Sequence, residues 1–196
     1  MKKILILLIV LPFSCKDATT SNISNALDIE QDTLAASNLQ DNIDQSVIDI
    51  WQDYLKEHPE FKSDRMPESW FFHNNEADAN RLAELVLKGK KKASSGLYYM
   101  YKAANVGLPA IGTKHIITDF SGKAKAIIQT TKVDTIPFNK ISEAYAALDM
   151  GTDIEPLDAW KKAHWEFFSS VFNENNTVPT ENMLVVCEWF EMVYKQ

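Results

Sequence analysis

The distribution of the large aromatic side chains is the feature that most constrains how this chain can fold. All five tryptophans lie between Trp51 and Trp189, whereas residues 16–47 contain no Trp, Tyr or Phe and are rich in small polar residues. A segment without large apolar side chains cannot bury enough surface to offset its conformational entropy. We therefore expect residues 15–47 to be a disordered tether and residues 48–196 to fold as one domain, a length typical of single domains.

The N-terminal residues have the pattern of a secretory signal peptide. Two lysines precede an unbroken apolar run from Ile4 to Leu11, which is too short to span a membrane as a stable helix. Cys15 directly follows Ser14, which resembles a bacterial lipoprotein signal, although the two residues before Ser14 depart from the usual motif. We expect residues 1–14 to be removed and Cys15 to be lipidated, so that the protein is anchored in the bacterial cell envelope and faces the periplasm or the exterior. The alternative is an ordinary signal peptide and a soluble secreted protein.

The charge balance of the expected domain limits its partners. From Trp51 onward the chain carries 17 basic and 20 acidic residues, so the domain is mildly acidic. Proteins that bind duplex DNA usually present a strongly basic face, and we expect no duplex DNA partner here. A local basic pocket for a small polar ligand or a short RNA is compatible with this balance.

Apolar side chains recur at helical or strand spacing along the domain. Asn75 is an expected N-cap for a helix that ends near Lys88, and Pro156 suits the first turn of a later helix. Ser121 and Gly122 form a short connection between two strand-like segments. Helices are expected over residues 47–58, 76–88, 142–148 and 156–172, and strands over residues 114–120, 123–133 and 183–194. This order predicts an α+β fold, in which helices surround a small sheet or barrel.

The cysteines and histidines show no sign of a disulfide framework or a metal site. Cys187 lies in the apolar run 183–187 and is expected to be a buried strand residue, which leaves Cys15 without a disulfide partner. The four histidines lack the spacing of metal ligands, and we expect no metal and no cofactor. His164 lies on an apolar helix face and is expected to be a hydrogen-bonded core residue.

A run of lysines followed by small residues, Gly89-Lys90-Lys91-Lys92-Ala93-Ser94-Ser95-Gly96, is the most informative segment for function. Gly89 offers a helix end, because glycine tolerates the left-handed conformation found there. The small residues that follow allow another molecule to approach the backbone. A lysine flanked by hydroxyls at such a position can hold a phosphate or polarise a carbonyl. The alternative is a solvated basic helix end that interacts favourably with the helix dipole.

Five segments in a fixed order resemble the ASCH-domain superfamily, most closely its small bacterial members with a tryptophan-rich start. These segments are residues 70–72, 82–91, 127–133, 164–168 and 185–188. The resemblance covers the whole expected domain. It implies a PUA-like small β-barrel with helices packed on its rim, and RNA or nucleotides as ligands. Some small members of the family are amidohydrolases that act on N4-acetylcytidine, and one is reported as a ribonuclease.

The resemblance also implies site residues. In the amidohydrolases the chemistry uses a lysine, a hydroxyl three positions later and a glutamate on a barrel strand. Carried over, these positions fall on Lys91, on Ser94, where threonine is usual, and on Gln129. A glutamine cannot transfer a proton as a glutamate does, so either this site only binds a ligand or the acid comes from elsewhere. The nearby acids to consider are Glu143, Asp149 and Asp153.

Two functions follow as hypotheses. In the first, an extracytoplasmic binding module holds a nucleoside, a nucleotide or a short RNA, with the ligand contacted by Lys90, Lys91, Ser94, Gln129 and Tyr98. In the second, the protein is an amide or phosphoester hydrolase, with Lys91 as base or electrostatic stabiliser and Ser94 as nucleophile or orienting group. A lipidated Cys15 argues against a role with cytoplasmic RNA, because the domain would never meet it.

Overall fold

The computed structural model describes residues 43–174 and 178–195. The predicted signal peptide, Cys15 and most of the predicted tether lie outside the described residues. The helices are α2 (Gln45–Glu57), α3 (Glu76–Leu87), α4 (Tyr98–Ala103), α5 (Glu143–Met150) and α6 (Pro156–Glu174), with short 3-10 turns at Pro59–Phe61 and Phe138–Lys140. The strands are β1 (Ser69–Trp70), β2 (Ala93–Leu97), β3 (Lys114–Thr118), β4 (Ala124–Pro137) and β5 (Leu184–Lys195). Within the described part of the chain, no helix has the length and apolar character needed to cross a membrane.

The strands of the described residues form one mixed sheet in the order β1-β3-β4-β5-β2. Its centre is the antiparallel pair β4 and β5, which stays paired from Ala126 opposite Lys195 to Pro137 opposite Leu184. The prediction of an α+β fold with helices around a small sheet or barrel is confirmed, and the sheet is open rather than a closed barrel, because the edge strands β1 and β2 are not paired with each other. A barrel requires its first and last strands to pair. β1 is only two residues long and pairs in parallel with β3, so it cannot supply that ladder.

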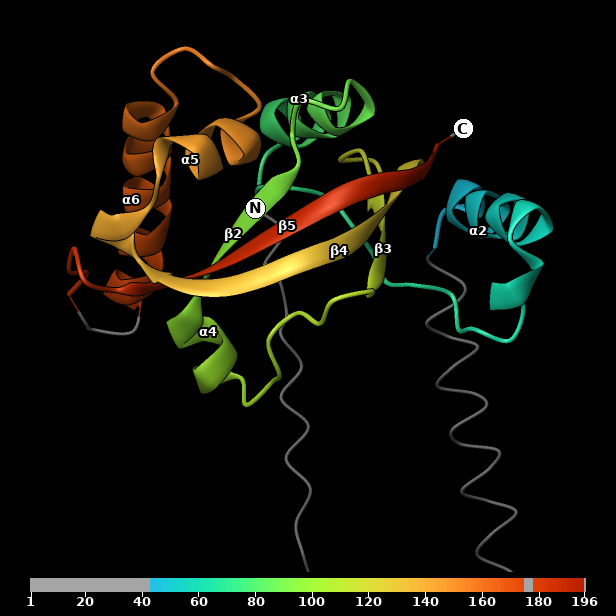
Figure 1. The fold of residues 1–196 in the computed structure, drawn as a ribbon, viewed down its shortest axis with the longest axis horizontal. Coiled ribbons are helices and arrows are strands. Elements are labelled where there is room, and N and C mark those ends of the chain that lie inside the picture. The colour runs from blue at the N-terminus through green and yellow to red at the C-terminus, as the bar shows by residue number, and fades with distance from the viewer. Residues whose placement is uncertain (1–42, 175–177, 196) are drawn as a thin grey trace, which may run out of the picture. The chain divides into compact units, whose positions relative to one another are not determined.

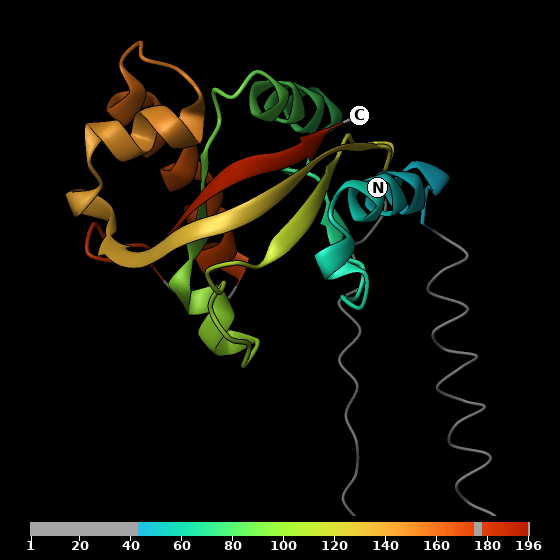
Figure 2. The same cartoon turned by 45° about the vertical axis from the view of Figure 1, so that its right-hand side comes forward.

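Helices cover both faces and one end of this sheet, as Figure 1 and Figure 2 show. Side chains alternate between the faces of a strand, so neighbouring residues of β4 serve different layers. Ile127 packs into the cluster under α2, whereas Ile128 packs into the cluster under α3. The third cluster lies where α5 and α6 pack side by side, and its largest buried residues are Trp160 and Phe168.

Most local signals in the sequence specify the observed helix boundaries. Asn75 caps α3 by accepting a hydrogen bond from the Asp78 amide at 2.9 Å, and Pro156 is the first residue of α6. α2 begins at Gln45, behind an Asp44 cap, so ordered structure begins a few residues before the expected domain start at residue 48. The strands β1 and β2 were not predicted, because β1 is very short and the β2 sequence Ala-Ser-Ser-Gly-Leu has few residues that favour strands.

The C-terminal end of α5 packs directly on the junction between α3 and β2. Gly151 ends α5 in the left-handed conformation, with φ of 66°. A Cβ atom placed on Gly151 would lie 3.0 Å from the Leu85 side chain and 3.4 Å from the Lys91 backbone nitrogen. The amide of Lys92 also donates to the carbonyl of Leu148 at 2.9 Å. These contacts fix the distance between α5 and the lysine run.

We predict that Gly151→Ala destabilises the protein more than Gly89→Ala does. Both glycines have positive φ, but a Cβ on Gly89 would meet nothing within 4 Å. Gly89→Ala therefore carries only the cost of the left-handed backbone, about 1–2 kcal/mol. Gly151→Ala adds overpacking against Leu85, which costs about 1–3 kcal/mol more. Urea denaturation of both variants measures the difference, and equal losses would contradict this packing.

Candidate functional site

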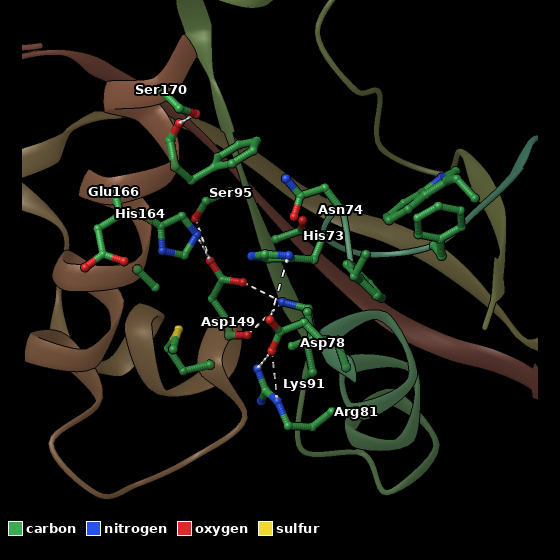
Figure 3. Close-up of a pocket in the computed structure, with 18 residues that line it drawn as sticks. His73, Asn74, Asp78, Arg81, Lys91, Ser95, Asp149, His164, Glu166 and Ser170 are labelled. Carbon is green, nitrogen blue, oxygen red and sulfur yellow. Dashed lines mark hydrogen bonds and ion pairs between the residues drawn. The ribbon is translucent and has the colours of Figure 1, made fainter. Parts of the chain in front are cut away.

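A pocket of about 610 Å³ opens where the sheet fails to close. Both sheet edges contribute to it, through Trp70 on β1 and Ser94 and Ser95 on β2. Helices α3, α5 and α6 complete the wall, as Figure 3 shows. The lining divides into an aromatic wall and a polar set. The aromatic residues are Trp70, Phe71, Phe72 and Phe167, and the polar residues include Lys91, Ser94, Ser95, Asp149 and His164.

A buried ion pair lies in the wall of the pocket. The side chains of Lys91 and Asp149 are only 4% and 3% exposed. The Lys91 ammonium donates to Oδ1 of Asp149 at 2.6 Å and to the Asp149 backbone carbonyl at 2.7 Å. The same ammonium lies over the ring of Phe72, and its nitrogen is 4.8 Å from the ring centroid. An ammonium that donates in an ion pair has no lone pair to offer as a base, so Lys91 acts here as a cation.

The second carboxylate oxygen of Asp149 is also fully partnered. Oδ2 accepts a hydrogen bond from the Ser95 hydroxyl at 2.6 Å and from the Trp160 indole at 2.8 Å. Burial alone raises the pKa of this carboxyl. The charge of Lys91 and the hydrogen bonds to the carboxylate outweigh burial, so the pKa of Asp149 lies below its usual value. Asp149 is therefore an ionised, fixed acceptor at neutral pH.

His164 faces the same carboxylate from α6. Its Nδ1 lies 2.9 Å from the Trp160 carbonyl oxygen, which can only accept, so we assign the ring hydrogen to Nδ1. Its Nε2 lies 3.4 Å from Oδ2 of Asp149. Burial lowers the pKa of His164 below its usual value, although the charge of Asp149 acts in the opposite direction. The lowered pKa favours the neutral ring. The expectation of a hydrogen-bonded core histidine is confirmed, and His164 also lines the pocket.

The structure brings two of the five expected ligand-contacting residues to this pocket, Lys91 and Ser94. Ser94 contributes a backbone carbonyl that accepts from the Tyr145 hydroxyl at 2.7 Å, whereas the hydroxyl on Asp149 belongs to Ser95. Ala93 and Leu97 pack in the core cluster under α5 and α6, and strand alternation places Ser95 on that same face. Lys90 is exposed, and neither Lys90 nor Tyr98 is part of the pocket lining.

Gln129 also lies outside the lining of this pocket. It follows Ile128, which faces α3, so strand alternation turns the Gln129 side chain to the opposite face of β4. Its amide nitrogen would be 3.8 Å from a Cβ atom on Gly112, beside the loop before β3. The carboxylate on Lys91 comes instead from Asp149, 58 residues further along the chain. Of the three acids that the sequence left open, Glu143 and Asp153 are not part of the lining.

Sequence reasoning missed the polar mouth of the pocket. His73 has a left-handed backbone with φ of 65°, uncommon for a residue with a side chain. Its Nδ1 lies 2.9 Å from Nδ2 of the Asn75 side chain, and the Arg81 guanidinium forms an ion pair with Asp78 at 2.9 Å. No pattern in the sequence marks His73, because its conformation depends on the turn that leads from β1 into α3. Among the described residues, no group of three or more His, Cys, Asp or Glu side chains could hold a metal ion.

We predict strong coupling between Lys91 and Asp149. Removing one partner of a buried ion pair leaves an unpaired buried charge and typically costs about 3–5 kcal/mol. We expect Lys91→Met and Asp149→Asn each to lose stability on this scale. The double variant should lose clearly less than the sum of the two. Urea denaturation of the four proteins gives the coupling energy, and additive losses would show that the pair contributes nothing.

Comparison with known proteins places this fold. A family model described as ASCH domain matches residues 68–194. A crystal structure of an ASCH domain from Lactobacillus crispatus JV V101 matches with a TM-score of 0.72 and 31% sequence identity, covering 78% of this chain and 97% of that chain. A crystal structure of a protein from Enterococcus faecalis V583 matches with a TM-score of 0.67 and 35% identity, covering 76% of this chain and 88% of that chain. No curated protein matches.

The open sheet with its surrounding helices is consistent with the PUA-like fold that the resemblance implied. The family model covers well over half of the chain, and both solved structures are matched over most of their own length. These matches agree with the resemblance that residues 70–72, 164–168 and 185–188 carry in the sequence. The chain belongs to the ASCH domain family.

Proposed function

We propose that the pocket binds a small polar ligand with a planar ring, of the nucleoside or nucleotide type. The observation that carries this proposal is the buried Lys91–Asp149 pair, which borders a pocket with aromatic side chains on its wall. Small-molecule sites are typically of about 300–1,000 Å³ and combine apolar walls with a few placed polar groups. Planar bases stack on aromatic side chains, and charged groups fix their orientation.

The ligand groups that this pocket can bind follow from its open donors and acceptors. Lys91 uses two N–H groups on Asp149, which leaves its third for a ligand oxygen. In the neutral ring of His164, Nε2 carries a lone pair that can accept from a ligand N–H or O–H. A single nucleoside-sized molecule or the end of a short RNA fits this arrangement. Lys90, Gln129 and Tyr98 are not part of the proposed contact set, because they lie outside the lining.

Hydrolysis of an amide or a phosphoester is the second candidate function. The observation that favours it is the set of groups on one wall: the cation of Lys91, the Ser95 hydroxyl and the neutral His164 ring, all around the Asp149 carboxylate. Amide hydrolysis needs a cation or a donor near the carbonyl oxygen and a group that moves a proton. Lys91 would stabilise the developing negative charge rather than act as the base.

The location of the protein is a separate proposal that rests on the sequence alone. We propose that Cys15 is lipidated and tethers the domain outside the cytoplasm, because Cys15 follows Ser14 at the end of an apolar signal-like run. Nucleosides or oligonucleotides from the surroundings are then the available ligands.

We predict that Cys15→Ser releases the protein from the membrane fraction. A lipid on Cys15 supplies the anchor, and serine cannot carry the thioether-linked lipid. Fractionation of cells that express the full chain measures this, with the unmodified chain as the control. A Cys15→Ser protein that stays with the membranes would contradict lipidation.

We predict that a nucleoside-type ligand raises the melting temperature of the full chain and that Phe167→Ala removes most of this effect. A ligand that binds only the folded state stabilises it by mass action. Loss of one stacked ring should weaken binding by about 1–3 kcal/mol. Phe167 is 40% exposed, so its removal should leave the fold intact. The measurement is thermal unfolding against cytidine, N4-acetylcytidine, other nucleosides, nucleotides and short RNAs.

Tyr99→Ala is the matched control, because Tyr99 is 36% exposed and lies outside the pocket lining. A shift lost in Phe167→Ala and kept in Tyr99→Ala supports binding in this pocket. No shift with any compound would overturn the proposed ligand class. Release of cytidine from N4-acetylcytidine would support hydrolysis, and the absence of turnover for bound amides would leave a binding protein.

A further inference from the structure

Two hydrogen-bond acceptors lie 3.4 Å apart in the wall of the pocket without a hydrogen between them. The hydrogen of neutral His164 is on Nδ1, where it donates to the Trp160 carbonyl at 2.9 Å. The opposite nitrogen, Nε2, therefore carries only a lone pair and lies 3.4 Å from Oδ2 of Asp149. Figure 3 shows His164 beside Asp149 and Ser95. A proton placed on Nε2 would turn this contact into an ion pair.

The charged groups around His164 come from several elements. Asp149 on α5 attracts a proton on the ring, whereas Lys91 before β2 and His73 after β1 oppose it. Glu166, two residues further along α6, also lines the pocket. Because Lys91 already neutralises Asp149, a charged His164 would leave the cluster with one excess positive charge. A negative charge that develops in the pocket would compensate for it.

We propose that Nε2 of His164 is the proton acceptor of this pocket and that Asp149 stabilises the protonated ring. This inference rests on amide hydrolysis, the second of the two proposed functions. A water molecule at Nε2 gives its proton to this nitrogen while its oxygen forms a bond to the carbonyl carbon of the amide. When the C–N bond breaks, the same proton passes from Nε2 to the leaving nitrogen. The released carboxylic acid and amine account for the atoms of the amide and the water, and the ring is neutral again.

The surrounding contacts suit this role. Trp160 holds the ring by its carbonyl and by stacking, with ring centroids 4.3 Å apart, so that Nε2 keeps its direction. The ammonium of Lys91 lies on the same carboxylate and can meet the negative charge on the amide oxygen. The positive charge gained by His164 and the negative charge gained by the substrate therefore appear together and offset each other.

The tautomer of His164 tests the geometric part of the proposal without a ligand. The full chain with isotope-labelled histidine rings gives nitrogen resonances that distinguish Nδ1–H from Nε2–H, and His164→Asn identifies the resonances of residue 164. We expect a neutral ring with hydrogen on Nδ1 near neutral pH, and titration below the ordinary value of about 6.5. Hydrogen on Nε2, or a charged ring at neutral pH, would overturn the proposal.

The dependence of hydrolysis on pH tests the catalytic part, with N4-acetylcytidine as the probe. Protonation fills the acceptor, so kcat/KM should fall as the pH drops through the pKa of His164 measured by its resonances. His164→Asn should lose about 10²–10⁴-fold in kcat and should not show this acidic limb. His58→Asn, at the end of α2 and outside the lining, is the matched control and should retain both rate and limb.

Each result supports or overturns the proposal. An acidic limb that persists in His164→Asn, or a variant with an unchanged rate, would overturn a role in proton transfer. If the unmodified protein does not hydrolyse the probe although the probe raises its melting temperature, hydrolysis fails while ligand binding stands. If the probe neither binds nor reacts, the ligand class itself fails. In both cases the proton transfer falls with the hydrolysis, and the tautomer still reports whether His164 is an acceptor.

Discussion

The buried pair of Lys91 and Asp149 is the interaction on which the site depends. It joins Lys91, just before edge strand β2, to Asp149 in the last turn of α5, 58 residues further along the chain. The attraction between two buried ions offsets the free energy of their desolvation only when further hydrogen bonds are made to their remaining donors and acceptors. Here the backbone carbonyl of Asp149 accepts a hydrogen bond from Lys91, and the side chains of Ser95 and Trp160 donate to the carboxylate. The polar cluster thereby holds β2, α5 and α6 in one arrangement.

The pocket exists because the sheet stays open. β1 has two residues and pairs only with β3, so the gap between β1 and β2 is covered by α3, α5 and α6 rather than by backbone hydrogen bonds. Side chains from both sheet edges consequently reach the same cavity. Aromatic residues lie on β1 and just after it, whereas polar residues lie on β2 and α5. One wall of the pocket therefore suits a planar ring and the other suits polar groups.

Much of the fold could be predicted from local patterns, whereas only part of the site could. The Asn75 cap, the Pro156 helix start and the buried Cys187 are encoded by neighbouring residues and are confirmed. The lysine run stood out from the residues themselves, the family resemblance pointed to Lys91 within it, and Lys91 is the buried lysine of that run. Gln129 shows the limit, because aligning a strand position with a family motif does not reveal which face of β4 its side chain occupies.

The sequence by itself determined the secondary structure of most segments, the family and the position of Lys91, because caps, helical periodicity and motif order are local properties of the chain. Only the tertiary structure decided that the carboxylate of Asp149 pairs with Lys91 and that Ser95 rather than Ser94 donates to this carboxylate. It also decided that His164 borders the pocket. The physical reason is that these contacts join β2, α5 and α6 across a sheet that does not close. Their distances depend on how Gly151 lets α5 pack against Leu85, which no local pattern encodes.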